Sequence, residues 1–588
     1  MKGKHSESIG KMLFLGAAIL CVISIVAIFS FLILRSIPFF QKIGLRDFLF
    51  GEVWSPDRYD TYGTPNPVGS YGILPMLVGT LLSGLSALLF GGTLGVFFAV
   101  FLVFFCPKRL RSLCNSLVLL LAGIPSVVYG FFGISFLLPI FSKVAPTNGS
   151  GLLATTLILG TMILPTVVAL FKTALEAVPK SYYTGAVGLG SSHVQAVFCT
   201  MVPSARAGMR NALLLGLGRA LGETMAVILV AGNAPTYPAG LFRSFRVLTA
   251  NIAMEMSYAG ELQEGALIAT GCVLLVLILI FNLLLEHRTR LPKKAKLSDR
   301  LTAWKNLFFT SAMIRARVGI MILSGVFVIA ILIVLPSFLV WKGLPTWLNS
   351  PSFLFGKYEF GAQEITLLPS LVATLMAMLV SLAVAIPTGV MAAVYLHEYA
   401  TKNGWIVRTV RRAVGLLNGV PSIVYGLFGM MAFLPLLGGS ASILAGALTV
   451  SILLLPTVIR ATEESLSAVE AGQREGSFAL GEGKTGTVLR IVLPAAFPGI
   501  LSAVLLSIGR VLSESAPFLY TMGSVLTAMP RSYFDRGTTL AAALYQLAGE
   551  GWHIEEAYAT ALILLIAVFA LNLLTSHLAA KLHRTPKI

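Results

Sequence analysis

The chain has 588 residues, of which 56% are hydrophobic and only 12% are charged, and its formal net charge is +18. Several stretches exceed the roughly 18 to 20 apolar residues that are needed to cross a bilayer. This composition excludes an ordinary soluble globular protein and predicts a polytopic membrane protein in a lipid bilayer.

The first apolar run follows Lys2, Lys4 and Lys11 and extends from 12 to about 37. It is longer than the apolar core of a signal peptide and has no obvious small-residue cleavage site, so we interpret it as an uncleaved membrane helix. Eleven further runs follow, and we predict an all-α protein with twelve spans. They lie near 12–37, 71–105, 115–142, 151–172, 207–232 and 263–285 in the first half, and near 318–341, 366–396, 411–437, 440–459, 497–522 and 556–580 in the second.

Lys and Arg residues gather on one side of this topology, which the positive-inside rule assigns to the cytoplasm. We therefore expect a multi-pass protein of the bacterial inner membrane with both termini cytoplasmic. Because the basic runs flank membrane helices, nucleic acid is not an expected partner. The five cysteines and seven histidines show no disulfide or metal-site spacing, so no metal is expected. The basic segments are Lys108–Arg111, Lys172–Arg210, Arg288–Arg317, Lys402–Arg412, Arg460–Arg490 and Lys581–Lys587.

The two halves of the chain are repeats of one another. The sequence GIPSVVYGFFG at 123–133 matches GVPSIVYGLFG at 419–429 at eight of eleven positions. An even number of spans separates matching positions, so the halves form a parallel repeat. We predict a first six-span half over 1–290, a cytoplasmic linker over 291–316 and a second six-span half over 317–588.

Four prolines lie within the apolar spans at matching places. Pro125 and Pro165 in the first half correspond to Pro421 and Pro456 in the second. A proline inside a helix removes a backbone hydrogen bond, so each is expected to kink its span. The kinks serve packing alone or contribute to gating; the sequence leaves both open.

A projecting segment, here called a lug, is predicted between the fourth and fifth spans of each half, over 173–205 and 464–495. In the first lug, Val194, Val197 and Met201 follow the spacing of one helix face after Gly190. A short helix, a glycine break and a second helix would form the lug. The alternative is an amphipathic helix that lies on the lipid headgroups.

One charged motif occurs twice within the apolar spans. GRALGET at 218–224 recurs as GRVLSES at 509–515, which is 291 residues later. Insertion scales give a cost of about 2.5–3.5 kcal/mol for each Arg, Lys or Asp at the centre of a membrane helix. The i, i+4 spacing predicts that each arginine and its glutamate lie on one helix face. Two matched pairs at such a cost indicate a charged solute.

The functional interpretation is an oxyanion path between the halves. Arginine suits this role because its planar fork bonds phosphate oxygens bidentately. The glutamates would compete for the arginines and keep the anion from being trapped, while nearby hydroxyls add donors. The alternative is that each pair neutralises itself and locks helices together. The predicted path residues are Arg219, Glu223, Thr224, Arg510, Glu514 and Ser515.

The second lug carries EGSFALG at 475–481, followed by IVLP at 491–494. This pattern resembles the EAA loop of ABC-importer permeases, which docks into a groove of a cytoplasmic ATPase. Together with the GRALGET and GIPSVVYG motifs, it resembles the permease subunits of the phosphate-specific importer. The first half, with GETMAV at 222–227, resembles the C-type subunit, and the second, with SESAP at 513–517, resembles the A-type subunit. The two subunits are usually separate chains and here look fused.

The resemblance implies a type I ABC importer permease (MetI-like), built as a pseudo-dimer of two six-helix halves. It also implies an ABC ATPase dimer on the cytoplasmic side and an extracytoplasmic phosphate-binding protein as partners. Two departures occur, since Thr184 stands where the EAA glutamate belongs and Ser513 replaces the usual glycine. The residues expected to couple to the ATPase are Thr184, Gly185, Gly190, Pro203, Glu475, Gly476, Gly481 and Pro494.

The chain itself is not expected to bind ATP or any other cofactor. The segment 481–485 has a faint likeness to a P-loop, but Phe478 occupies the position of the required first glycine. The predicted function is the permease component of an ATP-driven phosphate importer, not an enzyme. The alternatives are a permease for another oxyanion such as sulfate or molybdate, an ion-gradient-driven transporter or channel, and an intramembrane enzyme.

Overall fold

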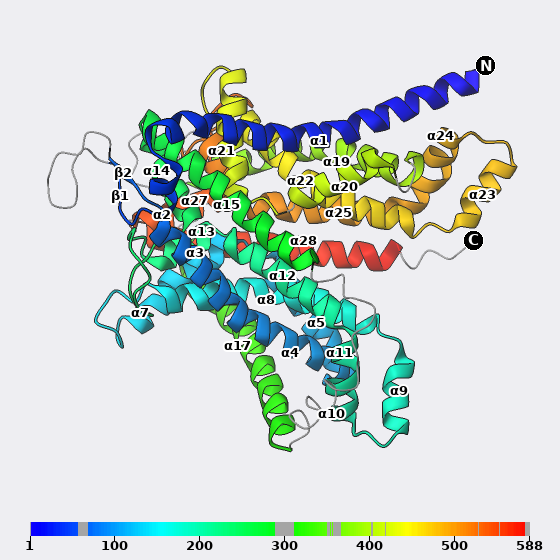
Figure 1. Ribbon diagram of the computed structural model, residues 1–588, viewed down its shortest axis with the longest axis horizontal. Coiled ribbons are helices and arrows are strands. Elements are labelled where there is room, and N and C mark those ends of the chain that lie inside the picture. Colours follow the sequence, from blue (N-terminus) through cyan, green and yellow to red (C-terminus); the bar gives the residue numbers. More distant parts are fainter. Residues whose placement is uncertain are drawn as a thin grey trace. The chain divides into compact units, whose positions relative to one another are not determined.

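The computed structural model describes residues 2–56, 69–287, 311–349, 353, 356, 366–400, 404–417, 419–526, 529–551 and 553–582. Contacts within the chain divide it into two compact units, whose helices are shown in Figure 1. Unit 1 comprises Met1–Leu45, Ile252–Leu275 and Lys342–Ile588, and unit 2 comprises Arg46–Asn251 and Val276–Trp341. Residues 291–310 of the predicted linker lie outside the described residues.

The described part of the chain contains nine helices that are long and apolar enough to cross a membrane, and three bent helix pairs that pass the same test. Counting each bent pair once gives up to twelve spans, and each coincides with one of the twelve predicted runs. The only strands among the described residues are two short ones, β1 (Trp54–Ser55) and β2 (Ser70–Tyr71), which pair antiparallel. The prediction of an all-α polytopic membrane protein is confirmed.

Unit 2 contains most of the first half. Its helices are α2 (Leu45–Phe50), α3 (Leu74–Ala87), η1 (Leu88–Gly92), α4 (Thr93–Val100), η2 (Phe101–Phe105), α5 (Lys108–Gly123), α6 (Ser126–Phe132), η3 (Gly133–Leu137), α7 (Leu138–Phe141), α8 (Leu152–Glu176), α9 (Lys180–Gly188), α10 (His193–Ala196), η4 (Val197–Met201), α11 (Val202–Ser204), α12 (Arg206–Leu221), α13 (Met225–Ala231), the start of α14 (Leu248–Glu255) and most of α17 (Ser311–Asn349).

Unit 1 contains most of the second half. Its helices are α1 (Lys2–Lys42), η5 (Met256–Tyr258), much of α15 (Glu261–His287), α19 (Leu368–Val394), η6 (Tyr395–Tyr399), α20 (Trp405–Leu417), α21 (Ser422–Leu436), α22 (Ile443–Ser467), α23 (Ala471–Ala479), α24 (Lys484–Thr487), η7 (Val488–Val492), α25 (Leu493–Ser513), α26 (Ala516–Thr521), α27 (Leu540–Glu550) and α28 (Ile554–Leu582).

The first helix of each sequence half packs on the other half's helices. In unit 1, α1 lies along α19 and α20 (Figure 1), and the ring of Phe14 lies 5.4 Å from that of Tyr399. In unit 2, α17 contacts first-half helices, and Phe327 packs edge-on against Phe90 with their centroids 5.2 Å apart. The first helix of each sequence half thus belongs mostly to the contact unit of the other half. The predicted domain boundaries remain a prediction.

The four prolines act differently from one another. Pro125 directly precedes α6 and separates it from α5 with a bend of 93°, which is a break rather than a kink. Pro421 directly precedes α21 in the same way. Pro165 and Pro456 are buried inside α8 and α22, and neither ends its helix. The difference is local: at 125 and 421 the backbone is already extended, whereas at 165 and 456 the helix continues past the missing N–H group.

The repeat extends to single hydrogen bonds. The buried hydroxyl of Tyr129 donates to the carbonyl of Leu121 at 2.8 Å, and that of Tyr425 donates to the carbonyl of Leu417 at 2.7 Å. In both halves, the tyrosine of the shared motif thus bonds a carbonyl near the C-terminal end of the helix before the proline. The same carbonyls also accept from the backbone N–H groups of Ile124 and Val420, so the tyrosine adds a second hydrogen bond at the bend and stabilises it.

Two membrane helices of unit 2 approach each other closely at a pair of glycines. A Cβ atom at Gly91 of η1 would overlap the carbonyl oxygen of Gly160 in α8. Gly91→Ala should therefore destabilise the protein by about 1–3 kcal/mol, because the backbone must move apart. The measurement is the thermal unfolding midpoint of the purified protein in detergent. Gly325→Ala in α17, where the space is open, is the matched control and should leave the midpoint unchanged or raise it slightly, because alanine favours a helix over glycine. An equal shift in both variants would contradict this interpretation.

Candidate functional site

The charged motif does not lie within a continuous helix. In the first half, α12 ends at Leu221 and the chain turns by 65° before α13. In the second half, α25 ends at Ser513 before α26 begins. The arginines therefore occupy the last helical turn, while Glu223, Thr224, Glu514 and Ser515 lie in or at the edge of the break. Neither glutamate lies in the helix of its arginine, so the expected shared helix face is absent, although Arg510 and Glu514 remain at ion-pair distance.

Proline explains the break in the second half. Pro517 is the second residue of α26, and a helix continuing through it would bring its ring against the carbonyl of Ser513. Glu514 accordingly has an extended backbone, with φ −80° and ψ 133°. In the first half, the carboxylate of Glu223 accepts a hydrogen bond at 3.4 Å from the backbone N–H of Ala226 in the new helix. A glutamate at this position favours restarting the helix over continuing it.

Each arginine is held by a threonine of a neighbouring helix. Arg219 donates from Nη1 to the hydroxyl of Thr166 at 3.0 Å, and Arg510 donates from Nη1 to Thr457 at 2.8 Å. Donor and acceptor are 53 residues apart in both cases. All four side chains are partly exposed. A positive charge in the last turn also interacts favourably with the partial negative charge at a helix C-terminus.

Only one of the two glutamates forms an ion pair with its arginine. Nε of Arg510 lies 3.6 Å from a carboxylate oxygen of Glu514. Among the described residues, Arg219 forms no such ion pair, and Glu223 instead bonds Ala226 and accepts at its backbone carbonyl from the hydroxyl of Thr249. The alternative in which both pairs neutralise themselves thus matches the geometry of the second half only.

Sequence reasoning missed the threonine partners. Thr166 and Thr457 directly follow Pro165 and Pro456, which are interpreted from the sequence as kinks that serve packing or gating. The signal was present, since these threonines are separated by 291 residues, as are the arginines. Two polar residues that keep the same spacing on different helices of a repeat are candidates for mutual contact.

Both predicted lugs have the expected helix–glycine–helix form. The glycine between the helices adopts the left-handed region, with φ +87° at Gly190 and φ +84° at Gly481. This region disfavours residues with a Cβ atom. The preceding leucines, Leu189 and Leu480, are 90% and 91% exposed, so each lug presents a bare apolar tip. The predicted coupling residues Thr184, Gly185, Glu475 and Gly476 are also exposed, whereas Pro203 lies in α11 and Pro494 opens α25.

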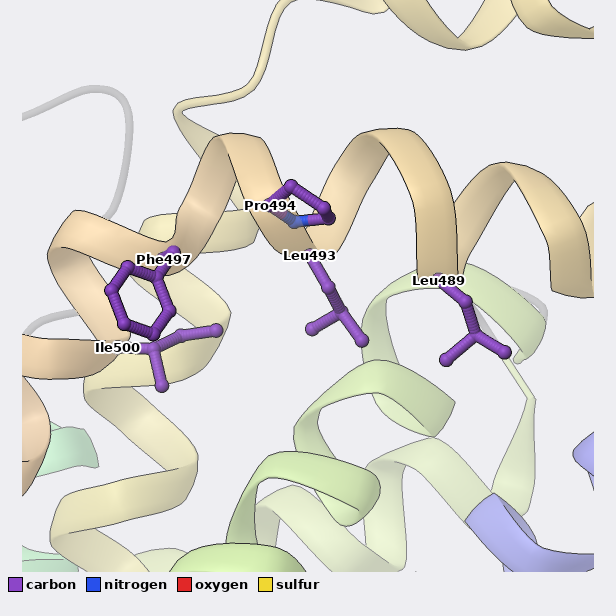
Figure 2. Close-up of a pocket in the computed structure, with 5 residues that line it drawn as sticks. All are labelled: Leu489, Leu493, Pro494, Phe497 and Ile500. Carbon is purple, nitrogen blue, oxygen red and sulfur yellow. The ribbon is translucent and has the colours of Figure 1, made fainter.

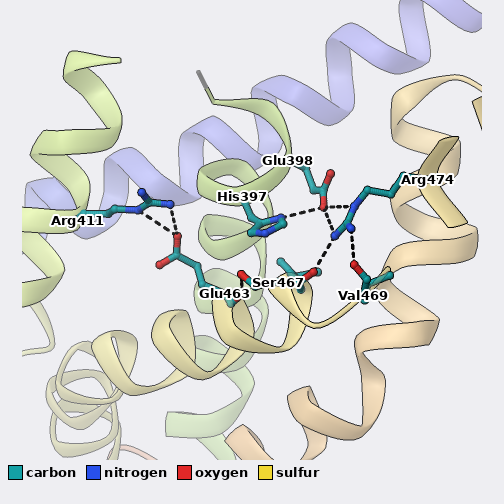
Figure 3. A network of polar contacts seen from close by, with 8 residues as sticks. His397, Glu398, Arg411, Glu463, Ser467, Val469 and Arg474 are labelled. Carbon is teal, nitrogen blue, oxygen red and sulfur yellow. Dashed lines mark hydrogen bonds and ion pairs between the residues drawn. The ribbon is translucent and has the colours of Figure 1, made fainter. Parts of the chain in front are cut away.

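An arginine fastens the second lug to a membrane helix. Figure 3 shows Arg474 of α23 reaching Glu398 of η6, with Nη2 and Oε1 3.0 Å apart. The same guanidinium donates at 2.7 Å to the carbonyls of Leu466 and Val469, at and just beyond the end of α22. The side chains of Arg474 and Glu398 are 17% and 10% exposed. One cation thus joins α22, α23 and η6.

The first lug is fastened by aromatic rings instead. Tyr183, which occupies the position matching Arg474, bonds His193 Nδ1 through its hydroxyl at 2.8 Å. The ring of Phe105 in η2 packs edge-on against His193 at 4.8 Å. Both lugs therefore contact the π-helical end of the second span of their half, through ion pairs in one and rings in the other.

A pocket of about 540 Å³ lies elsewhere, along η7 and α25 (Figure 2). All its lining residues are apolar, so it offers an oxyanion no donor from a side chain. No group of His, Cys, Asp and Glu suited to a metal ion occurs within the described residues. The pocket is lined by Leu489, Leu493, Pro494, Phe497 and Ile500.

Comparison with known proteins places this geometry in a family. The family model for the inner membrane component of binding-protein-dependent transport systems matches twice, at residues 91–291 and 385–586. The chain belongs to this family. It carries two permease domains in one polypeptide, and each match contains one lug and one Arg–Thr pair.

Several relatives extend the comparison. The chain is 30% identical over 576 residues to a phosphate transport system permease protein PstA homolog of Mycoplasma pneumoniae, covering 86% of each chain. It is 33% identical over 284 residues to the probable ABC transporter permease protein YqgH of Bacillus subtilis, covering 47% of this chain and 89% of the relative. It is 47% identical over 144 residues to phosphate transport system permease protein PstA 1 of Mycobacterium tuberculosis, which is 24% of this chain and 46% of the relative.

The Arg474 contacts generate a prediction about the second lug. Arg474→Gln should lower the free energy of opening of α23 by about 1–3 kcal/mol, because hydrogen bonds to a charged group are lost in a largely buried setting. The measurement is amide hydrogen exchange of 471–479 in the purified protein. Arg490→Gln is the matched control, because Arg490 is 77% exposed and lies 3.5 Å from Glu482. Unchanged exchange in the Arg474 variant would show that the contact does not hold the lug.

Proposed function

We propose that this chain is the transmembrane permease of an ATP-driven importer for inorganic phosphate. The observation that carries the proposal is the matched Arg–Thr pair at a helix break in each of two permease domains. The names of the relatives support phosphate as the solute, since two of the three relatives described above, the PstA homolog and PstA 1, are permease proteins of phosphate transport systems. The first half would serve as the C-type domain and the second as the A-type domain.

The chemistry of the site suits an oxyanion. Guanidinium offers five N–H donors in a planar fork and stays protonated at any physiological pH. Arg219 and Arg510 each give one donor to a threonine and keep others that can face an anion. Glu514, 3.6 Å from Arg510, competes for the same cation. A competing carboxylate limits how tightly phosphate is held, which a path needs if the anion is to leave.

The lugs supply the coupling in this proposal. Their exposed leucine tips would dock into a groove on a separate ATPase dimer, which would hydrolyse the ATP. The lugs and both termini would then be cytoplasmic, in the bacterial inner membrane. On the opposite side, a phosphate-binding protein would deliver the anion. Glu475 is present in the second lug and Thr184 in the first, so the second lug is expected to couple more strongly.

Direct transport tests the proposal. The chain is reconstituted into proteoliposomes with its cognate ATPase and phosphate-binding protein, and radiolabelled phosphate uptake is followed with and without ATP. We expect uptake only when ATP and all three proteins are present. Labelled sulfate and molybdate in parallel identify the oxyanion. Uptake that persists without the ATPase, driven by an ion gradient, would refute the proposal.

The Arg510–Glu514 pair allows a charge-balanced test of the path. The double substitution Arg510→Gln with Glu514→Gln removes both charges and strands neither, unlike a single change. We expect phosphate uptake to fall by about ten-fold or more, since a charge-assisted bond to the anion is lost. Co-purification with the ATPase should be unaffected. A double variant that assembles and transports at the normal rate would show that the arginine has a structural role only.

A further inference from the structure

The threonines that hold the arginines differ from three other threonines of α8, although not from all, since Thr156 of α8 also bonds a side chain, the hydroxyl of Ser86. Along α8, Thr155, Thr161 and Thr173 each donate the hydroxyl hydrogen to the carbonyl four residues earlier. Such back-bonding is the usual way for a hydroxyl in a helix to be satisfied. Thr166 instead accepts from Arg219, and Thr457 of α22 accepts from Arg510.

Each of these hydroxyls keeps its hydrogen available. A hydroxyl has one donor and two acceptor sites, and the arginine occupies only an acceptor site. Within the described residues, neither Thr166 nor Thr457 donates to any acceptor. Both side chains are partly exposed, as are the arginines beside them. An oxyanion next to the guanidinium is the acceptor that would complete the set.

The first half provides a second observation. Thr224, in the break after Arg219, is only 2% exposed, and its hydroxyl oxygen has no hydrogen-bond partner within the described residues. A buried hydroxyl without a partner is costly and indicates an unfilled contact. The hydroxyl of Thr224, which has no partner, therefore lies five residues after Arg219. Arg219 is in turn bound to Thr166, whose hydroxyl hydrogen is still available.

We propose that Thr166 and Thr457 are binding residues of the phosphate path. Each threonine orients the arginine of its own half and donates its hydroxyl hydrogen to the oxyanion that this arginine binds. This inference rests on the proposed phosphate transport. It changes the unit of recognition in each half from a lone arginine to an Arg–Thr pair contributed by two helices. Because Thr166 belongs to α8 and Thr457 to α22, each pair also links the anion to one of these helices.

The two pairs are not equivalent. Arg510 has Glu514 as a second partner at 3.6 Å, so it keeps one restraint when Thr457 is changed. Within the described residues, Thr166 is the only hydrogen-bond or ion-pair partner of the Arg219 side chain. Loss of the hydroxyl should therefore be more harmful in the first half than in the second.

The test compares valine and serine at each position in the reconstituted importer. Valine keeps the β-branched shape and removes the hydroxyl, whereas serine keeps the hydroxyl. We expect phosphate uptake at saturating binding protein to fall about ten-fold in Thr166→Val and about three-fold in Thr457→Val, with Thr166→Ser and Thr457→Ser near the wild-type rate. ATP hydrolysis stimulated by the binding protein should stay near its normal rate, so less phosphate moves per ATP.

Controls separate this inference from the proposed function. Thr161→Val, one turn earlier in α8, removes a hydroxyl that bonds only its own helix and should transport normally. If the wild-type complex moves no phosphate, the proposed function fails. If it does, and both valine variants match it, the threonine inference fails alone. Equal losses in valine and serine variants, or a parallel loss of stimulated ATP hydrolysis, would assign the threonines a packing role and overturn the inference.

Discussion

The hydrogen bond from guanidinium to threonine is the interaction on which the arrangement of both permease domains depends. A lone arginine among apolar helices is expensive, and its cost falls when donors are satisfied and the charge lies at a helix C-terminus. Arg219 and Arg510 meet both conditions. Ending the helix just after the arginine, rather than continuing it, exposes the polar backbone where an anion would pass.

The bond also relates the fifth span of each half to the fourth. α12 is tied to α8 and α25 to α22 through the arginine, and the lug connects the same two helices at their other ends. A displacement of the lug is therefore applied to both helices that form the Arg–Thr pair. Helix, lug, helix and hydrogen bond therefore form a closed loop without any long flexible connection.

Much of this was predictable from the sequence, and the reasons differ by feature. The twelve spans follow from apolar run length, and the repeat from direct comparison of 123–133 with 419–429. The lug glycines were identified because a helix–turn–helix needs a left-handed residue, and Gly190 and Gly481 have it. Both helix breaks were missed because each lies within one long apolar run; Pro517 marks the break in the second half, and in the first half the carboxylate of Glu223 accepts from the nearby N–H of Ala226. The Arg–Thr contacts were missed because a span-by-span reading pairs residues within one helix.

The exchange of first helices has a consequence for how the chain is made. α1 contacts α15 of the first half through Ser36 and Cys272, but it also packs against α19, which begins at residue 368, so more than three hundred residues separate it from this second partner. During that interval α1 is held in the bilayer by its own apolarity, since the hydrocarbon core and the first-half helices are all that surround it. α17, in turn, completes a first half that has already been inserted. Each half is therefore finished by a segment of the other, and joining them in one chain guarantees the equal supply that two separate subunits would need to achieve by balanced expression.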